Sequence, residues 1–600
     1  TIDQPFRVHA GCTLVTSPAG DQHPVTGTVM KDNGTSSSPG DRLAVVSRWV
    51  PGLAESRRYQ RAWLRRDIIA GLALTGNLVP AGMAYAEASG LPAITGLYAT
   101  IVPLLAYAAL GPSRLLILGP DSSLVPLVLA ALAPFAMFGP EARVEHAALL
   151  AVMVGLLMGV MGLARLGFVA DLISMPVREG YLLGIAVIIF AAQLPALFGV
   201  SVDAGGVLER FAALAEAIAA GETNLAALAV GLGCLLVILG ARRFDQRLPG
   251  VLLAVVGATI VSALLDLAER ADVSVVGVLP QGLPSLSLPA IDPETIATLL
   301  PAAVSIVLVT AADTVILSRT IADRHRYRAS PDQELLALGG ANLATGLFSG
   351  YPISSSSSRT AVADAAGQRT QLAGVIGALA IAVLLIWLPG LLAALPRSAL
   401  AAVVIAAAVG LIVVPAWQRL WRWHKSEFAV AAVTFAGVVL IGVVEGILIA
   451  VVLSLLAFLR RAWWPHAAVL GRQTGLKGYH DLAYYPEAKR LPGLVLYRFD
   501  APLSFFNADN FREQVIEVVD AATPRTTWVV IAAEPITEID TSAAEQLLLL
   551  LEQLDDRGVT LAFAELKDPV RARLRDYELM ARIGEEHFFP TVGAAVHAYV

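Results

Sequence analysis

Stretches of about twenty mostly apolar residues recur along the middle of this chain, and they limit its possible folds more than any other feature. Uninterrupted runs are Ala147–Leu163, Leu225–Leu239, Val251–Leu267, Ala373–Leu395, Ala399–Val414 and Phe428–Leu459. Runs broken by Gly, Pro or polar residues are Asp67–Ala86, Leu97–Leu110, Leu118–Phe135, Met175–Leu197, Thr298–Ser318, Leu335–Leu347 and Ile353–Ala366. Dividing the longest run at Gly442–Gly446 predicts a multi-span α-helical membrane protein with about 14 spans.

Composition supports a membrane protein and excludes several other classes. Only 15% of the 600 residues are charged, whereas a soluble chain carries about 25%. The net charge of −6 argues against nucleic-acid binding. Cys12 and Cys234 are too few for a disulfide framework or a zinc site, and Cys234 is expected to be a buried apolar residue. No nucleophile–base pair or metal-ligand pattern indicates an enzyme or a bound cofactor.

Basic residues gather at alternate ends of the apolar runs. The clusters are Arg57, Arg58, Arg61, Arg65 and Arg66 before the first run, Arg242, Arg243 and Arg247 after the sixth, Arg319, Arg324, Arg326 and Arg328 after the eighth, Arg419, Arg422 and Lys425 after the twelfth, and Arg460 and Arg461 after the last. Loops rich in Lys and Arg stay in the cytoplasm. The pattern predicts a multi-pass protein of the plasma membrane with both termini cytoplasmic.

The two ends of the chain differ in composition from the apolar middle part. Residues 1–55 are rich in Gly, Ser, Thr, Pro and Asp and are predicted to form a disordered tail. Residues 56–463 are expected to form the membrane domain. Residues 464–600 are predicted to form a small cytoplasmic α/β domain with a largely parallel sheet. Its expected strands are Gly493–Asp500, Trp528–Ala533 and Gly558–Ala564, and its expected helices are Phe511–Ala521 and Ser542–Arg557.

Two interrupted segments occupy matching places in the two halves of the membrane domain. One is Arg114–Ser123, which turns from an extended piece into a helix at Gly119-Pro120; the other is Tyr351–Thr360. Paired broken segments of this kind indicate a transporter site between inverted repeats. A helix N-terminus offers free N–H groups and about half a positive charge. Two such termini meeting at the membrane midplane predict a binding site for a small anion.

Several side chains at these helix starts are candidate anion ligands. Ser122, Ser357 and Ser358 offer hydroxyl donors, and Arg359 adds a fixed positive charge. A snorkelling role at the interface is the structural alternative for Arg359, but intramembrane charges are rare and usually functional. Asp121 is either part of the site or an N-terminal helix cap. For the whole serine run the alternative is a flexible linker, which its apolar flanks disfavour.

The eighth run contains a carboxylate, Asp313, followed by Thr314. A carboxylate at membrane depth must be protonated, paired or bound to a cation. Asp313 with Thr314 is therefore a candidate coupling site for H⁺ or Na⁺. Asp313 could instead balance Arg359, and the structural alternative is a permanent ion pair. In the first run, Pro80 is expected to break the helix. Tyr85 is either a substrate contact or an aromatic residue of the interfacial belt.

Several motifs together resemble the SulP family of sulfate permeases and anion transporters. They read Asp67-Ile68-Ile69-Ala70-Gly71-Leu72, Val79-Pro80-Ala81-Gly82-Met83-Ala84-Tyr85-Ala86, Gly90 through Tyr98 with Pro103, Leu118-Gly119-Pro120-Asp121, and Ser354–Arg359 with Gly367 and Thr370-Gln371-Leu372. The resemblance implies two inverted repeats of about seven spans each, divided into a core and a gate domain. It also implies an elevator movement and a homodimer.

By this resemblance, Ser358 and Arg359 contact the anion, Tyr85 lines the pocket and Asp313 takes the coupling position. Ala81 departs from the family pattern, because many members have Gln there, so one polar contact to the anion is expected to be absent. The C-terminal domain resembles a STAS domain, with Ser542 at the place of a regulatory phosphorylation site. The alternative for that turn, and the preferred one, is a plain helix cap.

These features predict a secondary active transporter of a small inorganic oxyanion. The resemblance favours sulfate as the substrate, and Asp313 favours uptake together with H⁺. One rival on the same scaffold is bicarbonate uptake with Na⁺. A rival of another class is an uncoupled anion channel, against which the acidic Asp313 argues. A nucleobase permease of similar architecture would place acidic residues rather than Arg359 at the substrate.

Overall fold

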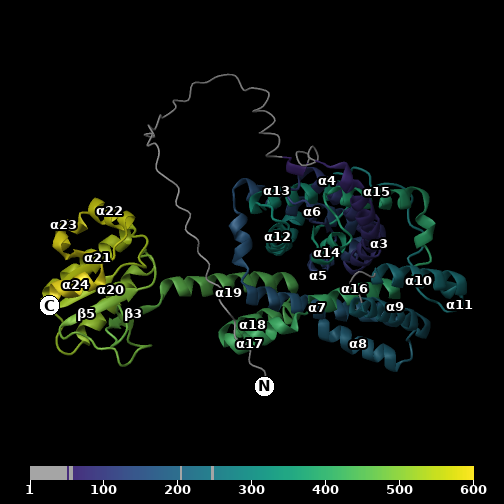
Figure 1. Ribbon diagram of the computed structural model, residues 1–600. Helices are drawn as coiled ribbons and strands as arrows, with labels where there is room; N and C mark the ends of the chain where they lie inside the picture. Colours follow the sequence, from purple (N-terminus) through teal and green to yellow (C-terminus); the bar gives the residue numbers. More distant parts are fainter. Residues whose placement is uncertain (1–49, 53–58, 203, 205, 245–248) are drawn as a thin grey trace, which may run out of the picture. The chain divides into compact units, whose positions relative to one another are not determined.

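The computed structural model describes all residues except 1–49, 53–58, 203, 205 and 245–248. The predicted tail at residues 1–55, including Cys12, lies outside the described residues apart from 50–52. In the first half the longer helices are α3 (Leu64–Ala88), α4 (Ala93–Leu110), α5 (Val125–Leu132), α6 (Gly139–Leu163), α7 (Met175–Phe198), α8 (Val207–Ala219), α9 (Leu225–Phe244) and α10 (Gly250–Leu265). In the second they are α12 (Pro293–His325), α13 (Pro331–Leu347), α14 (Ser357–Ala365), α15 (Leu372–Trp387), α16 (Arg397–Leu411), α17 (Val414–Trp423), α18 (Lys425–Leu440) and α19 (Val443–Trp463) (Figure 1).

Each apolar run predicted from the sequence contains a helix or most of one, and the predicted division of the longest run is confirmed. Helix α18 ends at Leu440 and α19 begins at Val443. Between them Gly442 has a φ of 155°. Residues with a Cβ rarely adopt this φ, so a glycine at this position lets one helix end and the next begin with little backbone strain.

Pro80 does not break the first helix, and this prediction was wrong. Helix α3 continues from Leu64 to Ala88 with Pro80 inside it. A proline removes one backbone hydrogen bond and crowds the preceding turn. Neighbouring helices tolerate that loss within a membrane domain, and here Leu78, Val79 and Ala81 around the proline are all buried against other helices.

Eight helices among the described residues are long and apolar enough to cross a membrane, judged by length and composition alone. Two shorter apolar helices, α10 and α15, fall below that length. Helices α5 and α14 are short because the chain reaches them through extended segments. The predicted number of spans stays a prediction, because broken spans are not recognised by helix length.

The membrane domain consists of two groups of helices with different packing partners. Helix α12 packs on α6, α13 packs on α6 and α4, and α15 packs on α3. In the other group α7 packs on α16 and α18, and α9 packs on α16 and α10. We call the first the α12 group and the second the α7 group. They meet where α3 contacts α16 and α10.

After α19 the chain forms an α/β domain around a six-stranded sheet. The strands are β3 (Ala467–Gly471), β4 (His480–Asp481), β5 (Leu494–Phe499), β6 (Trp528–Ala532), β7 (Thr560–Ala564) and β8 (Phe588–Phe589), in the order β4-β3-β5-β6-β7-β8. Strands β5 to β8 pair in parallel, which confirms the prediction. Helices α20 (Ala508–Asp520) and α21 (Thr541–Asp556) contribute to one hydrophobic cluster, and α24 (Val592–Tyr599) contributes to another.

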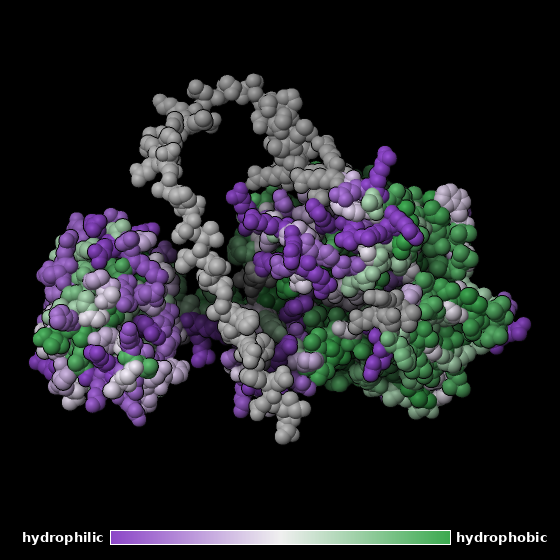
Figure 2. Space-filling model, in the orientation of Figure 1, coloured by the Kyte–Doolittle hydropathy of each residue, from purple (hydrophilic) through white to green (hydrophobic). Residues whose placement is uncertain are grey.

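The surfaces of the two regions differ as their sequences predict. Figure 2 shows a broad apolar surface over α9 and α10, whereas the α/β domain presents mostly hydrophilic residues. Exposed apolar side chains on these helices include Leu236 at 72%, Leu264 at 78% and Leu253 at 53% exposure. Apolar patches of this extent face lipid or another protein rather than water.

Candidate functional site

The two broken segments meet each other inside the membrane domain. Strand β1 (Leu118–Gly119) pairs antiparallel with β2 (Ser354–Ser355), so that Gly119 faces Ser354 in the register. Ser356 N–H also donates to Ile117 O at 3.0 Å. Because α5 follows one strand and α14 follows the other, this ladder brings the starts of the two helices together.

Polar side chains bind several further backbone groups in and beside the extended segments. The Asn342 side chain of α13 accepts a hydrogen bond from Ile353 N at 2.9 Å and donates to Ile353 O at 3.2 Å. Gln371 Nε2 donates to Ser113 O and Leu116 O, both at 2.8 Å. Backbone without helical hydrogen bonds is tolerated at membrane depth only when it is satisfied in this way or lines a cavity.

Arg359 lies in the first turn of α14 and is almost fully buried, with 2% of its side chain exposed. Its three guanidinium nitrogens have no hydrogen-bond acceptor among the described residues. The nearest acidic oxygen is Asp121 Oδ1, 3.9 Å from Nη2. The snorkelling alternative is wrong for this conformation, because the group does not reach a surface. A buried cation with unused donors is costly unless an anion completes it.

The start of α5 carries the opposite charge. Asp121 Oδ2 accepts hydrogen bonds from Ser123 N at 3.1 Å and Ser123 Oγ at 2.8 Å. These contacts stabilise the turn that leads into α5, which begins four residues later at Val125. Asp121 therefore caps the turn and also faces Arg359. Ser122 beside it is 7% exposed.

The hydroxyl groups of the second segment fall into two sets. Ser354, Ser355 and Ser356 are buried, whereas Ser357 and Ser358 at the start of α14 are exposed. Ser356 Oγ and Ser358 Oγ lie 3.2 Å apart. The flexible-linker alternative is wrong, because the run forms a strand and then the first turn of a helix.

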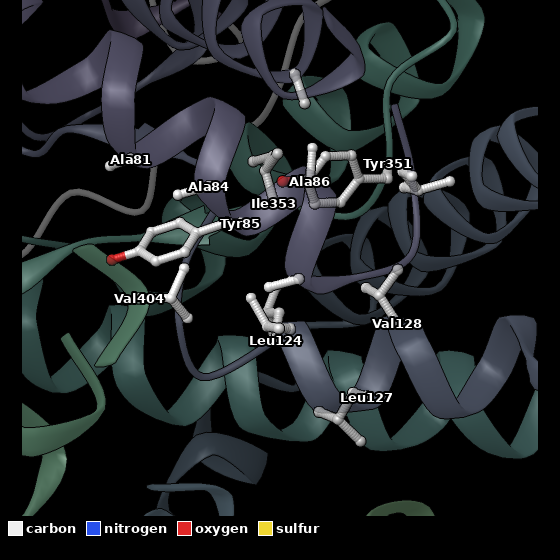
Figure 3. Close-up of a cluster of buried hydrophobic side chains, with 14 of the residues drawn as sticks. Ala81, Ala84, Tyr85, Ala86, Leu124, Leu127, Val128, Tyr351, Ile353 and Val404 are labelled. Atoms are coloured by element: carbon white, nitrogen blue, oxygen red, sulfur yellow. The ribbon is translucent and has the colours of Figure 1, made fainter. Parts of the chain in front are cut away.

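Two tyrosines flank this meeting point. Tyr85 of α3 is 8% exposed and Tyr351 is 1% exposed, and the Tyr351 hydroxyl has no hydrogen-bond partner among the described residues. Both belong to one buried cluster, in which Figure 3 draws Tyr85 near Val404 of α16 and Tyr351 near Ala86. Tyr85 is therefore not an interfacial belt residue here, since its ring points into the protein.

Asp313 does not pair with Arg359. Its Oδ1 lies 3.3 Å from Nε of Arg178, and its Oδ2 accepts a hydrogen bond from the Tyr181 hydroxyl at 3.2 Å. Both partners belong to α7. The neighbouring Thr314 Oγ1 lies 2.8 Å from Ser355 Oγ, which joins α12 to β2. The expected role of Asp313 as a balancing partner for Arg359 is thus replaced by an ion pair with the α7 group.

Sequence reasoning missed four residues that the structure places at or beside the site. Gly119 lies against the guanidinium, because a Cβ there would stand 3.1 Å from Arg359 Nη1. Tyr351 was passed over although it directly precedes Pro352 in the broken segment. Arg178 and Tyr181 left no local signal, since their contact with Asp313 joins segments more than a hundred residues apart.

The remaining sequence candidates lie elsewhere. Asp540 is the cap of α21: it accepts hydrogen bonds from Ala543 N and Phe505 N, both at 2.8 Å. Ser542 is exposed in the first turn of that helix and is not the capping residue. Cys234 is buried, as predicted, with its thiol 3.5 Å from Ala254 O.

Chemically, the arrangement is suited to binding an anion. The starts of α5 and α14 lie close together, and a helix start has free N–H groups and about half a positive charge. Arg359 adds five N–H donors, and nearby serine and tyrosine hydroxyls add more. No group of three or more His, Cys, Asp or Glu residues that could hold a metal occurs in the described part of the chain.

Comparison with known proteins assigns the chain to a family. Residues 64–434 match the model of the sulfate permease family, and residues 485–595 match the STAS domain. A probable sulfate transporter of Mycobacterium tuberculosis is 41% identical over 551 residues, covering 92% of this chain and 98% of that protein. Sulfate transporter 4.1, chloroplastic, of Arabidopsis thaliana is 31% identical and covers 93% and 82%.

A solved structure shares the fold. Murine Solute Carrier 26 family member A9, an anion transporter in the inward-facing state, superposes with a TM-score of 0.84 at 22% identity, covering 94% of this chain and 96% of that one. At this identity the likeness concerns the fold alone. The matches to the two family models and to the 41% identical relative show that this chain belongs to the sulfate permease family and carries a C-terminal STAS domain.

Proposed function

We propose that this protein is a secondary active transporter of a small inorganic oxyanion, most consistently sulfate, coupled to H⁺. One observation carries the proposal: the buried Arg359 guanidinium has unused donors where the starts of α5 and α14 meet. A tetrahedral oxyanion supplies acceptors to several donors at once. The names of the relatives from Mycobacterium tuberculosis and Arabidopsis thaliana favour sulfate.

The charges at the site favour coupling to a proton. Arg359 and the two helix termini supply about two positive charges, and Asp121 removes one of them. The ion pair of Asp313 with Arg178 is neutral. Bound sulfate would therefore leave one uncompensated negative charge. A proton on Asp313, the carboxylate paired across to α7, would restore the balance, which makes Asp313 our candidate for the coupling group.

The same proposal extends to the setting of the transporter. The distribution of basic residues favours a plasma-membrane protein with both termini cytoplasmic. The two separately packed groups of helices suit an elevator movement, in which the α12 group carries the anion site past the α7 group. We also propose a homodimer. Tyr85, Ser122, Ser357 and Ser358 are the proposed additional anion contacts.

Radiolabelled sulfate uptake by proteoliposomes tests the function. An imposed inward H⁺ gradient is expected to drive accumulation by the wild-type chain, and Asp313→Asn is expected to keep sulfate exchange while losing that accumulation. Accumulation retained by Asp313→Asn would contradict the coupling role. Parallel assays with bicarbonate under a Na⁺ gradient, and of current without any gradient, give the outcomes that would replace sulfate symport by its rivals.

A further inference from the structure

The ion pair of Asp313 joins the two groups of helices close to the anion site. Asp313 lies on α12, which packs on α6, whereas Arg178 and Tyr181 lie on α7, which packs on α16 and α18. Both carboxylate oxygens of Asp313 are engaged by α7 side chains. The contact is partly shielded from water, with 18% of the Asp313 and 33% of the Arg178 side chain exposed.

Position within α7 makes Arg178 unusual. It is the fourth residue of that helix, after Met175-Pro176-Val177. The N-terminal end of a helix carries partial positive charge and disfavours a cation by up to about 1 kcal/mol. The partial charge at this helix end therefore disfavours Arg178, and the structure gives it a carboxylate from a different helix as an ion-pair partner.

The other groups around Asp313 do not replace this partner. The charged and titratable groups facing it are Arg178 and Tyr181 of α7 and Asp121 of the turn before α5. Thr314 beside it is hydrogen-bonded to Ser355, and Glu334 of α13 is engaged by Tyr107, Ser113 and Ser318. Arg178 is thus the one cation among those that face Asp313 in the described part of the chain.

We propose that Arg178 and Tyr181 form a charge-dependent contact with Asp313, here called the latch, which holds the α12 group against the α7 group while Asp313 is ionised. Ionised Asp313 holds the latch closed. A proton added to the carboxylate removes its negative charge, breaks the ion pair and frees the α12 group to move; the same proton leaves when the latch closes again. Arg178 is a positioning residue in this scheme, because it touches the coupling carboxylate and not the anion. The inference rests on the proposed H⁺ coupling.

The latch predicts how transport depends on pH. Sulfate uptake should fall as pH rises through the range in which Asp313 ionises. Arg178→Gln removes the contact through which ionised Asp313 holds the α12 group, so uptake should persist to higher pH than in wild type, with the alkaline limb moved upward by about one pH unit or more. It should leave equilibrium sulfate binding within about twofold of wild type, since Arg359 is untouched.

A second ion pair between the groups provides the matched control. Glu87 of α3 and Arg397 of α16 lie 3.6 Å apart, on the boundary between the same groups but not in contact with Asp313. Arg397→Gln should leave the pH profile of uptake unchanged. If the Arg178→Gln profile superimposes on that of wild type, or if Arg397→Gln shifts it equally, the latch is refuted.

A measurement without transport separates this inference from the proposed function. At pH 8 in detergent, Arg178→Gln and Asp313→Asn should each change the melting temperature of the full chain, and the double variant should show no further change beyond Asp313→Asn. Additive effects would refute the coupling of the two side chains. Absence of sulfate uptake by the wild-type chain would overturn the proposed function, whereas this cycle would still decide whether the two residues act together.

Discussion

The starts of α5 and α14 are alike in backbone and opposite in charge. Each follows a two-residue strand, and the two strands pair with each other. One start carries Asp121, whose carboxylate binds its own turn, and the other carries Arg359, whose guanidinium has no acceptor among the described residues. The comparison indicates that the paired backbone sets the geometry of the site, while the full positive charge at the two helix starts comes from Arg359 of the second half.

Replacing Arg359 should reduce sulfate affinity more than any other change at the two helix starts. Arg359→Ala leaves the negative Asp121 beside two helix starts that carry only partial positive charge, and truncation of a buried charged partner costs about 2–5 kcal/mol. Sulfate affinity should fall by about 30-fold or more in an equilibrium binding assay with purified protein. Arg359→Lys should recover part of the lost affinity, because it restores the positive charge. Recovery should be incomplete, since the ammonium group lacks the planar set of donors of a guanidinium. An unchanged affinity in Arg359→Ala would exclude Arg359 from the site.

Crowding the guanidinium from the opposite strand should have the next largest effect. A Cβ at Gly119 would stand 3.1 Å from Arg359 Nη1, and the φ of Gly119 is 148°. Gly119→Ala should therefore weaken sulfate binding about tenfold and cost about 1–2 kcal/mol in backbone strain. Gly139→Ala is the matched control, since Gly139 has a φ of 89° and no atom within 4 Å of its Cβ. Equal losses of affinity in both variants would show that strain alone is responsible.

Neutralising the acidic start should move affinity in the opposite direction. Asp121→Asn keeps an oxygen for the bonds from Ser123 but removes a negative charge 3.9 Å from Arg359. Sulfate should bind about fivefold more tightly, corresponding to about 1 kcal/mol of relieved repulsion. Isothermal titration at constant ionic strength measures this difference. Weaker binding would mean that Asp121 mainly orients the guanidinium.

A third helix start, in the STAS domain, extends the comparison because its carboxylate, Asp540, binds backbone N–H groups of Ala543 and Phe505 and faces no cation of the anion site among the described residues. Asp540→Ala should destabilise that domain by about 1 kcal/mol, visible as faster amide hydrogen exchange in α21 of the full chain. Sulfate affinity should not change. Ser542→Ala is the control and should alter stability by less than about 0.5 kcal/mol, because the side chain is exposed and does not cap the helix.

Much of this architecture follows from short-range patterns. Apolar length located the helices, and the broken segments at Gly119-Pro120 and Tyr351-Pro352 indicated where the two halves meet. Spacing along one chain does not report which side chains face each other across helices. The sequence therefore indicated that Asp313 needs a partner, but the identification of Arg178 required the packing of α12 beside α7.

The error at Pro80 has a related physical origin. Proline destabilises a helix interior by about 3 kcal/mol in isolation, so a local reading favours a break. Burial of Leu78 and Val79 on the same turn against neighbouring helices can offset such a cost. Tertiary packing of this kind lies outside any local pattern, whereas the break at Gly442 needed only the backbone conformation of one residue.

The ladder between β1 and β2 has a thermodynamic consequence. Four residues, two from each half of the membrane domain, hold the two helix starts in one rigid cradle. In the proposed elevator movement, a cradle that keeps this geometry would present the same contacts to the anion on either side of the membrane. Intrinsic affinity is then expected to be equal on the two sides, so that the proposed ion gradient sets the direction of net flux and reversing the gradient reverses transport.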